Sequence, residues 1–285
     1  MILGTAQFGF EYGISNVHGK PSLNNVKDIL NFSLDNQISK LDTAFAYGDS
    51  ERIIGESGIS KKFDIISKIP SNLNQLKVDN KNIVNDLFFK SIQNLKVEKL
   101  YAYLLHSIDE LALMGDVLWN SMLDLKNSGY VDKIGYSVYS PSQLDLSYEK
   151  YKPDVIQIPM NVLDREFERT GWLEKLKSDK VEIHVRSVFL QGLLLMSYQD
   201  QLTKFPNHME IWKDWHNYLE NNQITPLQAC LGFINGKNLV DEIVLGVNTT
   251  EELMEIVNFK DYSVQRQFST SSTDENLIYP SKWKI

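Results

Sequence analysis

The chain has 285 residues, 42% hydrophobic and 23% charged, a composition typical of globular proteins with a sizeable core. Its 29 Lys and Arg against 37 Asp and Glu give a net charge of −8, and without a run of basic residues this disfavours nucleic acid and anionic membranes as partners. No stretch approaches the ~18 apolar residues of a membrane span, and no leader pattern opens the chain, so we expect a cytoplasmic protein.

Eight short runs of β-branched and aromatic residues alternate with longer segments of helical period. The predicted strands cover residues 1–5, 39–44, 63–69, 99–107, 133–138, 155–160, 181–187 and 242–247. The first predicted helix follows a Pro21-Ser22 start, and the others cover residues 50–57, 81–96, 110–128, 141–150, 168–178, 208–221 and 249–258. Such alternation predicts right-handed βαβ crossovers and a parallel sheet.

The number of units then favours one particular architecture. Eight units in a chain of this length favour a closed (β/α)8 (TIM) barrel over an open doubly wound sheet, although periodicity alone does not establish closure. We assign residues 1–260 to the barrel domain. Residues 261–285 show no convincing period, and we expect an irregular C-terminal tail packed along the barrel or over its mouth.

Polar residues stand where successive predicted strands end. Asp42 ends the second strand, Lys68 the third, His106 the fourth and Ser137 the fifth, and Gln157 lies in the sixth. Asp, Lys and His rarely enter a core unpaired. In a barrel of this type the chemistry occurs at the carboxyl ends of the strands, so these side chains are expected to converge on one mouth.

Eight segments together resemble a known family. They are GTAQFG at 4–9, LDTAFAYGDSERIIG at 41–55, SKI at 67–69, LLHS at 104–107, KIGYS at 133–137, QIPMN at 157–161, RSVFLQGLL at 186–194 and IVLGVNTTEEL at 243–253. Their types and order resemble the aldo-keto reductases. The resemblance implies a (β/α)8 barrel, a nicotinamide cofactor held without a Rossmann domain, and reversible reduction of an aldehyde or ketone. Consistently, no G-x-G-x-x-G follows a predicted strand.

Four residues fit the chemistry of carbonyl reduction. Hydride transfer to a carbonyl carbon places negative charge on the oxygen, so a proton donor must stand beside it, and Tyr47 is the candidate. The ammonium of Lys68 would lower the pKa of this phenol, and Asp42 would balance the buried charge of Lys68. His106 would hydrogen-bond the substrate carbonyl.

Taken singly, each of the four has an ordinary structural interpretation. Asp42 could cap a short helix, Tyr47 could be a half-buried aromatic, Lys68 could be a solvated loop residue and His106 could be a core histidine. Their order and their positions at strand ends favour the catalytic interpretation.

Further residues are implied by the resemblance to bind the nicotinamide end of the cofactor. Ser137 and Gln157 match the residues that hold the carboxamide and pack beneath the ring, and Arg186 stands where a tyrosine commonly stacks on it. Ser187 and Gln191 would lie near the pyrophosphate. Two positions depart from the family pattern, Val138 in place of an asparagine and Met160 in place of a tyrosine. Candidates near the same cofactor are also Thr5 and Gly246.

The adenosine end is expected at the start of the last predicted helix. Asn248 and Thr249 stand at its N-terminus, where free amides and hydroxyls can bind phosphate, although Thr249 could simply cap the helix. Residues 246–257 contain no Lys or Arg and three glutamates. The habit of the family favours NADPH as the cofactor, and NADH is a serious competitor.

The substrate is expected to be a small-molecule carbonyl compound. The long loop at residues 6–22 carries Phe8, Phe10 and Tyr12, which could line a pocket or pack the loop onto the barrel. Family members with a similar GKPS loop are often bacterial enzymes of sugar or surface-polysaccharide metabolism, and this resemblance implies a polar sugar derivative as substrate. Two other functions stay open: a cofactor-binding regulatory or sensing protein with little turnover, and an unrelated barrel enzyme that uses Lys68 as a Schiff-base amine. We expect a monomer or a small homo-oligomer.

Neither a disulfide nor a metal site is expected. Cys230 is the only cysteine and stands in an apolar context, so an intramolecular disulfide is excluded. Of the five histidines, only the widely spaced His208 and His216 suggest a pair, and these fit a solvated helix better than a metal site.

Overall fold

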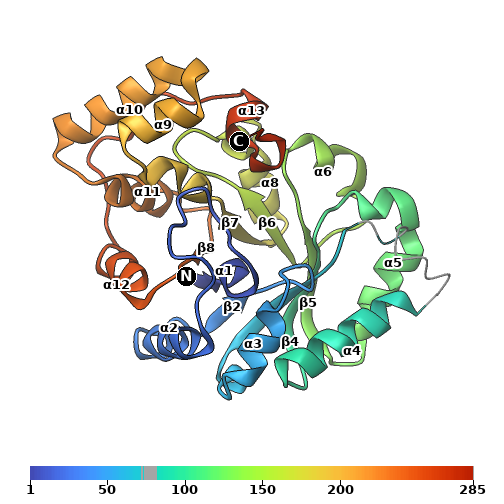
Figure 1. Cartoon of the computed structure of the whole chain (residues 1–285). Coiled ribbons are helices and arrows are strands. Elements are labelled where there is room, and N and C mark those ends of the chain that lie inside the picture. Colours follow the sequence, from blue (N-terminus) through green and yellow to red (C-terminus); the bar gives the residue numbers. More distant parts are fainter. Residues whose placement is uncertain (72, 74–81, 285) are drawn as a thin grey trace.

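Eight parallel strands pair in chain order and close into a barrel. Figure 1 shows the computed structural model, which describes residues 1–71, 73 and 82–284. The strands are β1 (Ile2–Gly4), β2 (Lys40–Asp42), β3 (Asp64–Ile69), β4 (Leu100–Leu105), β5 (Val131–Ser137), β6 (Val155–Pro159), β7 (Glu182–Arg186) and β8 (Glu242–Gly246). The closing pair joins β1 to β8, with Ile2 opposite Val244. The predicted (β/α)8 barrel is confirmed, and each strand overlaps its predicted run.

Helices surround the barrel (Figure 1). They are α1 (Ala6–Gly9), α2 (Leu23–Asp35), α3 (Ser50–Glu56), α4 (Ile83–Leu95), α5 (Glu110–Asn127), α6 (Ser142–Ser147), α7 (Glu166–Arg169), α8 (Trp172–Ser178), α9 (Tyr198–Lys204), α10 (Met209–Asn222), α11 (Pro226–Asn235), α12 (Thr250–Asn258) and α13 (Glu275–Ile278). The predicted start of α2 is confirmed, because the Ser22 side chain accepts a hydrogen bond from the Asn25 amide. Of the predicted helix 81–96, residue 81 lies outside the described residues.

The alternation of side chains along each strand divides the core into two parts. Ile2, Ile66, Ala102, Leu104 and Val155 form a small apolar cluster inside the barrel, separate from the large cluster between strands and helices. Residues two apart on a strand point to the same face, so Lys68 follows Ile66 into the barrel. Ser67 points the other way and donates a hydrogen bond to Glu51 of α3, at 2.6 Å.

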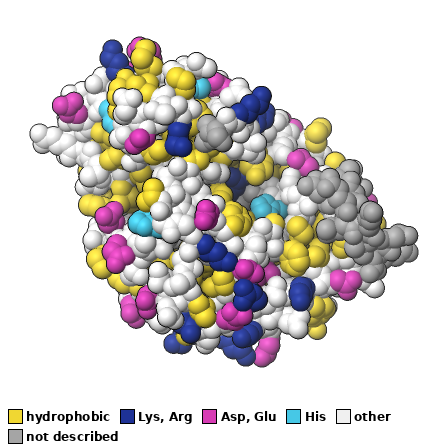
Figure 2. Space-filling model, viewed as in Figure 1, with side chains coloured by type: hydrophobic (Ala, Val, Ile, Leu, Met, Phe, Trp, Pro, Cys, Tyr) yellow, Lys and Arg dark blue, Asp and Glu magenta, His cyan; other side chains and the backbone are white. Residues whose placement is uncertain are grey.

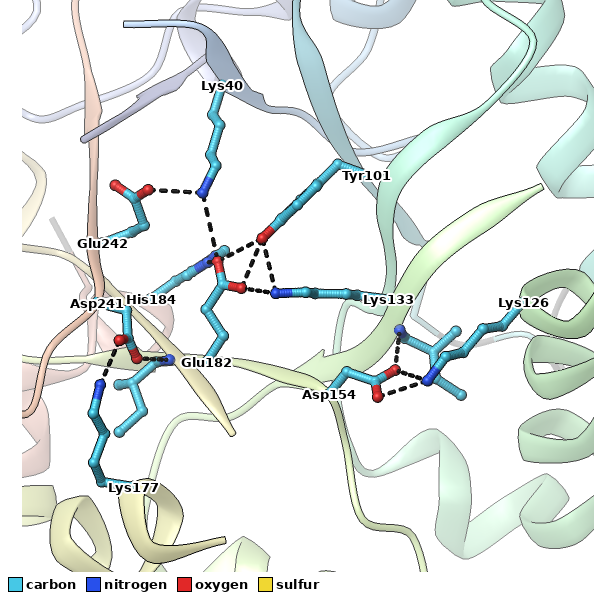
Figure 3. A network of polar contacts seen from close by, with 12 residues as sticks. Lys40, Tyr101, Lys126, Lys133, Asp154, Lys177, Glu182, His184, Asp241 and Glu242 are labelled. Atoms are coloured by element: carbon cyan, nitrogen blue, oxygen red, sulfur yellow. Dashed lines mark hydrogen bonds and ion pairs between the residues drawn. The ribbon is translucent and has the colours of Figure 1, made fainter. Parts of the chain in front are cut away.

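Charged side chains close the end of the barrel at which the strands begin (Figure 3). Glu182 at the start of β7 accepts hydrogen bonds from the Tyr101 hydroxyl (2.7 Å) and from Lys133 and His184. Lys40 lies 3.6 Å from Glu182 and 2.7 Å from Glu242, which also pairs with the amino group of Met1. We call Lys40, Tyr101, Lys133, Glu182, His184 and Glu242 the basal network.

The tail, residues 261–284, contains the short helix α13 and a 3-10 turn at Pro280–Lys282. Phe268, Leu277 and Ile278 are buried, and Arg165 donates hydrogen bonds to the Phe268 and Thr270 carbonyls. Trp283 packs edge-on against Phe205, with 5.1 Å between ring centroids. These contacts place the tail against the barrel, while its treatment as a unit separate from residues 1–260 stays a prediction.

The surface seen in Figure 2 carries Lys and Arg side chains interspersed with Asp and Glu. Within the described part of the chain, no helix combines the length and the apolar character needed to cross a membrane. Nor do the described His, Cys, Asp and Glu residues gather in a group of three or more suited to a metal ion.

Candidate active site

A cavity of about 960 Å³ opens at the end of the barrel where the strands finish. The predicted site residues that line it are Thr5, Asp42, Tyr47, Lys68, His106, Ser137, Gln157, Arg186, Ser187, Gln191, Gly246 and Asn248. Thr249 is not among the lining residues. Strand ends bring most of these side chains together because consecutive strands of the barrel are neighbours in space.

A buried ion pair lies at the floor of this cavity. The Lys68 ammonium is 2.5 Å from Asp42 Oδ1 and donates to the Thr43 carbonyl at 2.9 Å, and both side chains are almost fully buried. Burial lowers the pKa of Lys68 from its ordinary value, and the charge of Asp42 opposes this. Asp42 Oδ2 accepts a hydrogen bond from the Gln157 amide, so Gln157 contacts the ion pair, a contact that strand patterns do not reveal.

Tyr47 stands above the ion pair, in the loop between β2 and α3. The Lys68 nitrogen lies 5.1 Å from the centroid of its ring. Its hydroxyl makes no hydrogen bond to a described residue. Burial raises the pKa of Tyr47 above its ordinary value, Asp42 raises it further and Arg186 opposes the rise. The expected lowering of the Tyr47 pKa is therefore not found in this arrangement, because burial and the charge of Asp42 outweigh the nearby positive charge of Arg186.

His106 directly follows β4 and faces Tyr47 edge-on, with 5.6 Å between ring centroids. Burial and the nearby charges of Lys68 and Arg186 lower the pKa of His106 to about 4, so the imidazole is neutral at pH 7. Its Nδ1 atom is buried and has no hydrogen-bond partner within the described residues. A neutral imidazole can donate from one nitrogen and accept at the other, which suits contact with a carbonyl oxygen.

Three hydrogen bonds fix the orientation of the Arg186 guanidinium group at the end of β7. Its guanidinium donates to Ser137 Oγ (3.2 Å), to Ser187 Oγ (3.2 Å) and to the Val138 carbonyl (2.9 Å). One face covers the ring of Tyr139, 4.5 Å from its centroid. A planar, fixed guanidinium offers a surface on which an aromatic ring can stack.

The segment after β7 has an unusual backbone. Ser187, Leu190, Gln191 and Gly192 all have positive φ, between 49° and 92°. Three of them carry side chains, for which this conformation is uncommon, and such residues tend to cluster at functional sites. The Gln191 carbonyl accepts a hydrogen bond from the Ile14 amide at 3.1 Å, so the loop after β1 is joined to this segment.

Thr5 is fully buried beside Asp42. Its hydroxyl donates to the Asp42 carbonyl at 3.0 Å and accepts from the hydroxyl of Ser50, which bonds Thr43 in turn. In this position Thr5 holds the backbone of Asp42, although it also lines the cavity.

The N-terminus of α12 forms another part of the cavity wall. Asn248 is 9% exposed, and its Oδ1 atom is buried without a partner in the described chain. Thr249 caps α12 by accepting a hydrogen bond from the Glu252 amide at 3.2 Å, as its ordinary interpretation predicts. Glu252 and Glu255 line the cavity beside Asn248, and Glu252 also accepts from the Asn248 amide.

The long loop at residues 6–22 contributes two aromatic side chains to the cavity. Phe10 and Tyr12 line it, as one of the two interpretations of this loop predicts, whereas Phe8 is fully buried in the core.

Three other lining residues have no role assigned from the sequence. Tyr139 lies two residues after the strand end at Ser137, a spacing that a search limited to strand ends passes over. Pro280 and Ser281 come from the tail, whose sequence has no period from which their position follows.

Comparisons with known proteins agree with this fold. A model described as the Aldo/keto reductase family matches residues 1–270. The chain is similar to the solved structure of an aldo-keto reductase from Bacillus halodurans in its holo form, with TM-score 0.70 and 17% identity over 96% of this chain and 88% of that chain. It is also similar to a glycerol dehydrogenase from Gluconobacter oxydans, with TM-score 0.68 and 18% identity over 93% of this chain and 87% of that chain.

Identities this low make the structural likeness evidence of fold alone. No curated protein matches the chain. The family model spans nearly all of the sequence and so decides the assignment: the chain belongs to the aldo-keto reductase family.

Proposed function

We propose that this chain reduces an aldehyde or ketone to an alcohol with a reduced nicotinamide cofactor, and that Tyr47 donates the proton. The observation that carries the proposal is the meeting of Asp42, Tyr47, Lys68 and His106 in one cavity, although they come from three different strand ends and a loop. A protein that only bound a ligand would not need a phenol beside a buried lysine.

The lining of the cavity fits a nicotinamide dinucleotide. Arg186 presents a fixed planar group at one part of the wall, and Asn248 carries an unpartnered acceptor at another. When bound, the cofactor supplies the hydride.

The residues of the chain would handle the oxygen and the proton. His106, neutral at pH 7, would donate a hydrogen bond to the carbonyl oxygen and fix its orientation. Tyr47 keeps its proton because its pKa is raised, and it would release that proton only to the strongly basic oxygen formed by reduction. Lys68, balanced by Asp42, would stabilise negative charge near Tyr47 in a site with little water.

Tyr47→Phe tests the proposal. Carbonyl-dependent oxidation of the reduced cofactor should fall about 10²- to 10⁴-fold, the range for loss of a general acid. Cofactor affinity, followed by tryptophan fluorescence, should stay the same. Tyr130→Phe is the matched control, because Tyr130 lies outside the cavity and is 40% exposed. Binding of cofactor without turnover in the unaltered protein would contradict the proposal and favour a regulatory or sensing role.

The choice of cofactor is also a proposal. The family habit favours NADPH, but Glu252 and Glu255 line the wall at α12, and the described cations that line the cavity are Lys68 and Arg186. Two carboxylates near a 2′-phosphate would repel it. We therefore favour NADH over NADPH. Parallel fluorescence titrations with NADH and NADPH test this choice. Tighter binding of NADPH would contradict it and support the cofactor that the family habit favours.

For the substrate, we propose a small polar carbonyl compound such as a sugar derivative. The hydroxyl of Tyr12 and the side chains of His106 and Arg186 line the cavity together with the apolar ring of Phe10, which supports a substrate with hydroxyl groups. A screen that finds activity only on apolar aldehydes would contradict this choice.

A further inference from the structure

The tail supplies one wall of the cavity. Pro280 and Ser281 line the cavity and directly follow α13 and Tyr279. Leu277 and Ile278 of α13 are buried, whereas Ser281 is exposed. Apolar packing therefore fixes the tail before the wall, at residues 277 and 278, and after it, at Trp283. Between these two anchors, polar contacts can hold residues 280 and 281 in place.

One hydrogen bond holds the tail just before this wall. The Tyr279 hydroxyl donates to Glu166 Oε2 at 2.6 Å, and Tyr279 is 6% exposed. Glu166 is the first residue of α7, a short helix that follows β6. The Tyr279 carbonyl accepts from the Lys282 amide at 2.9 Å, so Tyr279 also closes the turn that carries Pro280 and Ser281.

A buried carboxyl group lies beside this contact. Asp164 is 1% exposed, its Oδ1 atom accepts from the Glu166 amide at 3.3 Å, and its Oδ2 atom has no partner among the residues described. The charged and titratable groups that act on it are Glu166 and Arg169 of α7 and Arg186 of β7, and Asp164 acts in turn on Tyr279 of the tail. Burial and the negative charge of Glu166 raise the pKa of Asp164 to about 7.

The same segment also contacts the part of the cavity wall that follows β7. Asn161 accepts a hydrogen bond from the Asp164 amide at 3.0 Å and donates to the Ser187 carbonyl at 3.1 Å. Ser187 in turn bonds Arg186. Residues 161–166 therefore join the tail to the wall that follows β7.

We propose that Glu166 and Tyr279 position the Pro280–Ser281 wall of the cavity, and that ionisation of the neighbouring Asp164 loosens this wall as the pH rises. A carboxylate without a partner is costly to bury, and it adds a second negative charge beside Glu166. Once the wall opens and water reaches Asp164, its pKa returns toward the ordinary 3.8. The open form thus ionises first, so the closed wall is favoured at low pH, weakens between pH 4 and 7, and weakens no further above pH 7.

Hydrogen exchange of the full chain tests the coupling between Asp164 and the wall, and it needs no substrate. The amides of residue 279 and of residues 281–284, corrected for the intrinsic pH dependence of exchange, should exchange up to about twentyfold faster at pH 7.5 than at pH 5.5. Asp164→Asn keeps the acceptor for the Glu166 amide but cannot ionise, so its corrected exchange should not change with pH. A pH effect of the same size in Asp164→Asn, or none in the unaltered chain, would overturn the coupling to pH.

Tyr279→Phe tests the positioning role. It keeps the ring that packs in the tail and removes only the hydroxyl bonded to Glu166, so residues 279–284 should exchange faster at both pH values. Tyr262→Phe, also in the tail but without a contact to Glu166, should leave exchange unchanged. Equal exchange in Tyr279→Phe and the unaltered chain would refute the proposal that the hydrogen bond between Tyr279 and Glu166 positions the wall.

The kinetic consequence rests on the proposed function. In Tyr279→Phe, KM for the carbonyl substrate should rise severalfold while kcat stays within about twofold, because the wall would contact the substrate away from the reacting atoms. If no substrate is turned over, the proposed function fails while the exchange result still decides the role of the wall.

Discussion

At the residue scale, Asp42 and Lys68 show how a buried charge depends on its partner. Both are almost completely buried and 2.5 Å apart. Asp42→Ala leaves the ammonium of Lys68 buried and uncompensated, so the free energy of unfolding should fall by about 3–5 kcal/mol. The double variant Asp42→Ala/Lys68→Met should lose less than Asp42→Ala alone. Urea unfolding measures all three proteins, and a loss below about 1 kcal/mol in Asp42→Ala would show that the pair is not buried from water.

His106 makes a prediction about pH. Its folded-state pKa of about 4 lies below the ordinary 6.5, so between these values the unfolded chain binds a proton that the folded chain does not. Stability should therefore rise with pH from 4 to 6.5 and then level off with respect to this group. His106→Gln should remove that part of the rise, as thermal unfolding at pH 5 and pH 7 can measure. An unchanged pH dependence in the variant would place His106 in contact with water.

At the element scale, α12 offers the sharpest test of cofactor choice. Glu255 lines the cavity from the exposed side of the helix, so its replacement should not disturb the core. Glu255→Lys replaces repulsion of a 2′-phosphate by attraction and should strengthen NADPH binding about tenfold while changing NADH binding little. Met254→Lys places a lysine at a neighbouring exposed position that does not line the cavity, and it is the control, although it changes the net charge by +1 where Glu255→Lys changes it by +2. Equal gains in both variants would assign the effect to net charge.

The strands could be predicted from the sequence because each buried run of β-branched residues is short and ends at turn residues. Helix α11 could not be predicted, because residues Ala229–Ile234 are all buried and the sequence therefore shows no polar face of helical period. Gly232 has no side chain, and there Val264 of the tail packs against the helix.

The positions of Asp42, Lys68 and His106 in the cavity could be predicted because each stands at the end of a predicted strand. The contact between Gln157 and Asp42 could not be predicted, because it crosses the barrel between strands that are far apart in sequence.

At the scale of the whole molecule, the same strands supply both ends of the barrel. Residues of one parity point inward, so β2 contributes Lys40 to the basal network and Asp42 to the cavity. In β7, Glu182 and Arg186 divide in the same way, with His184 between them. The apolar cluster around Ile66 and Leu104 lies between the two ends. The charged groups of the basal network and those of the cavity are therefore separated by an apolar layer.

This separation predicts that the basal network acts on stability and not on activity. Its partners lower the pKa of Glu182, so its stabilisation is present at neutral pH and is lost as the pH falls below its ordinary value of 4.5. Glu182→Gln weakens the contacts to Lys133 and Lys40 seen in Figure 3, and the free energy of unfolding at pH 7 should fall by about 3 kcal/mol. Glu98→Gln is the matched control, because Glu98 pairs with Lys61 while 92% exposed and should cost less than about 1 kcal/mol. Both variants should keep kcat/KM within about twofold, since catalysis in this fold takes place at the other end of the strands. A large loss of activity in Glu182→Gln at full stability would show that the two ends of the barrel are coupled.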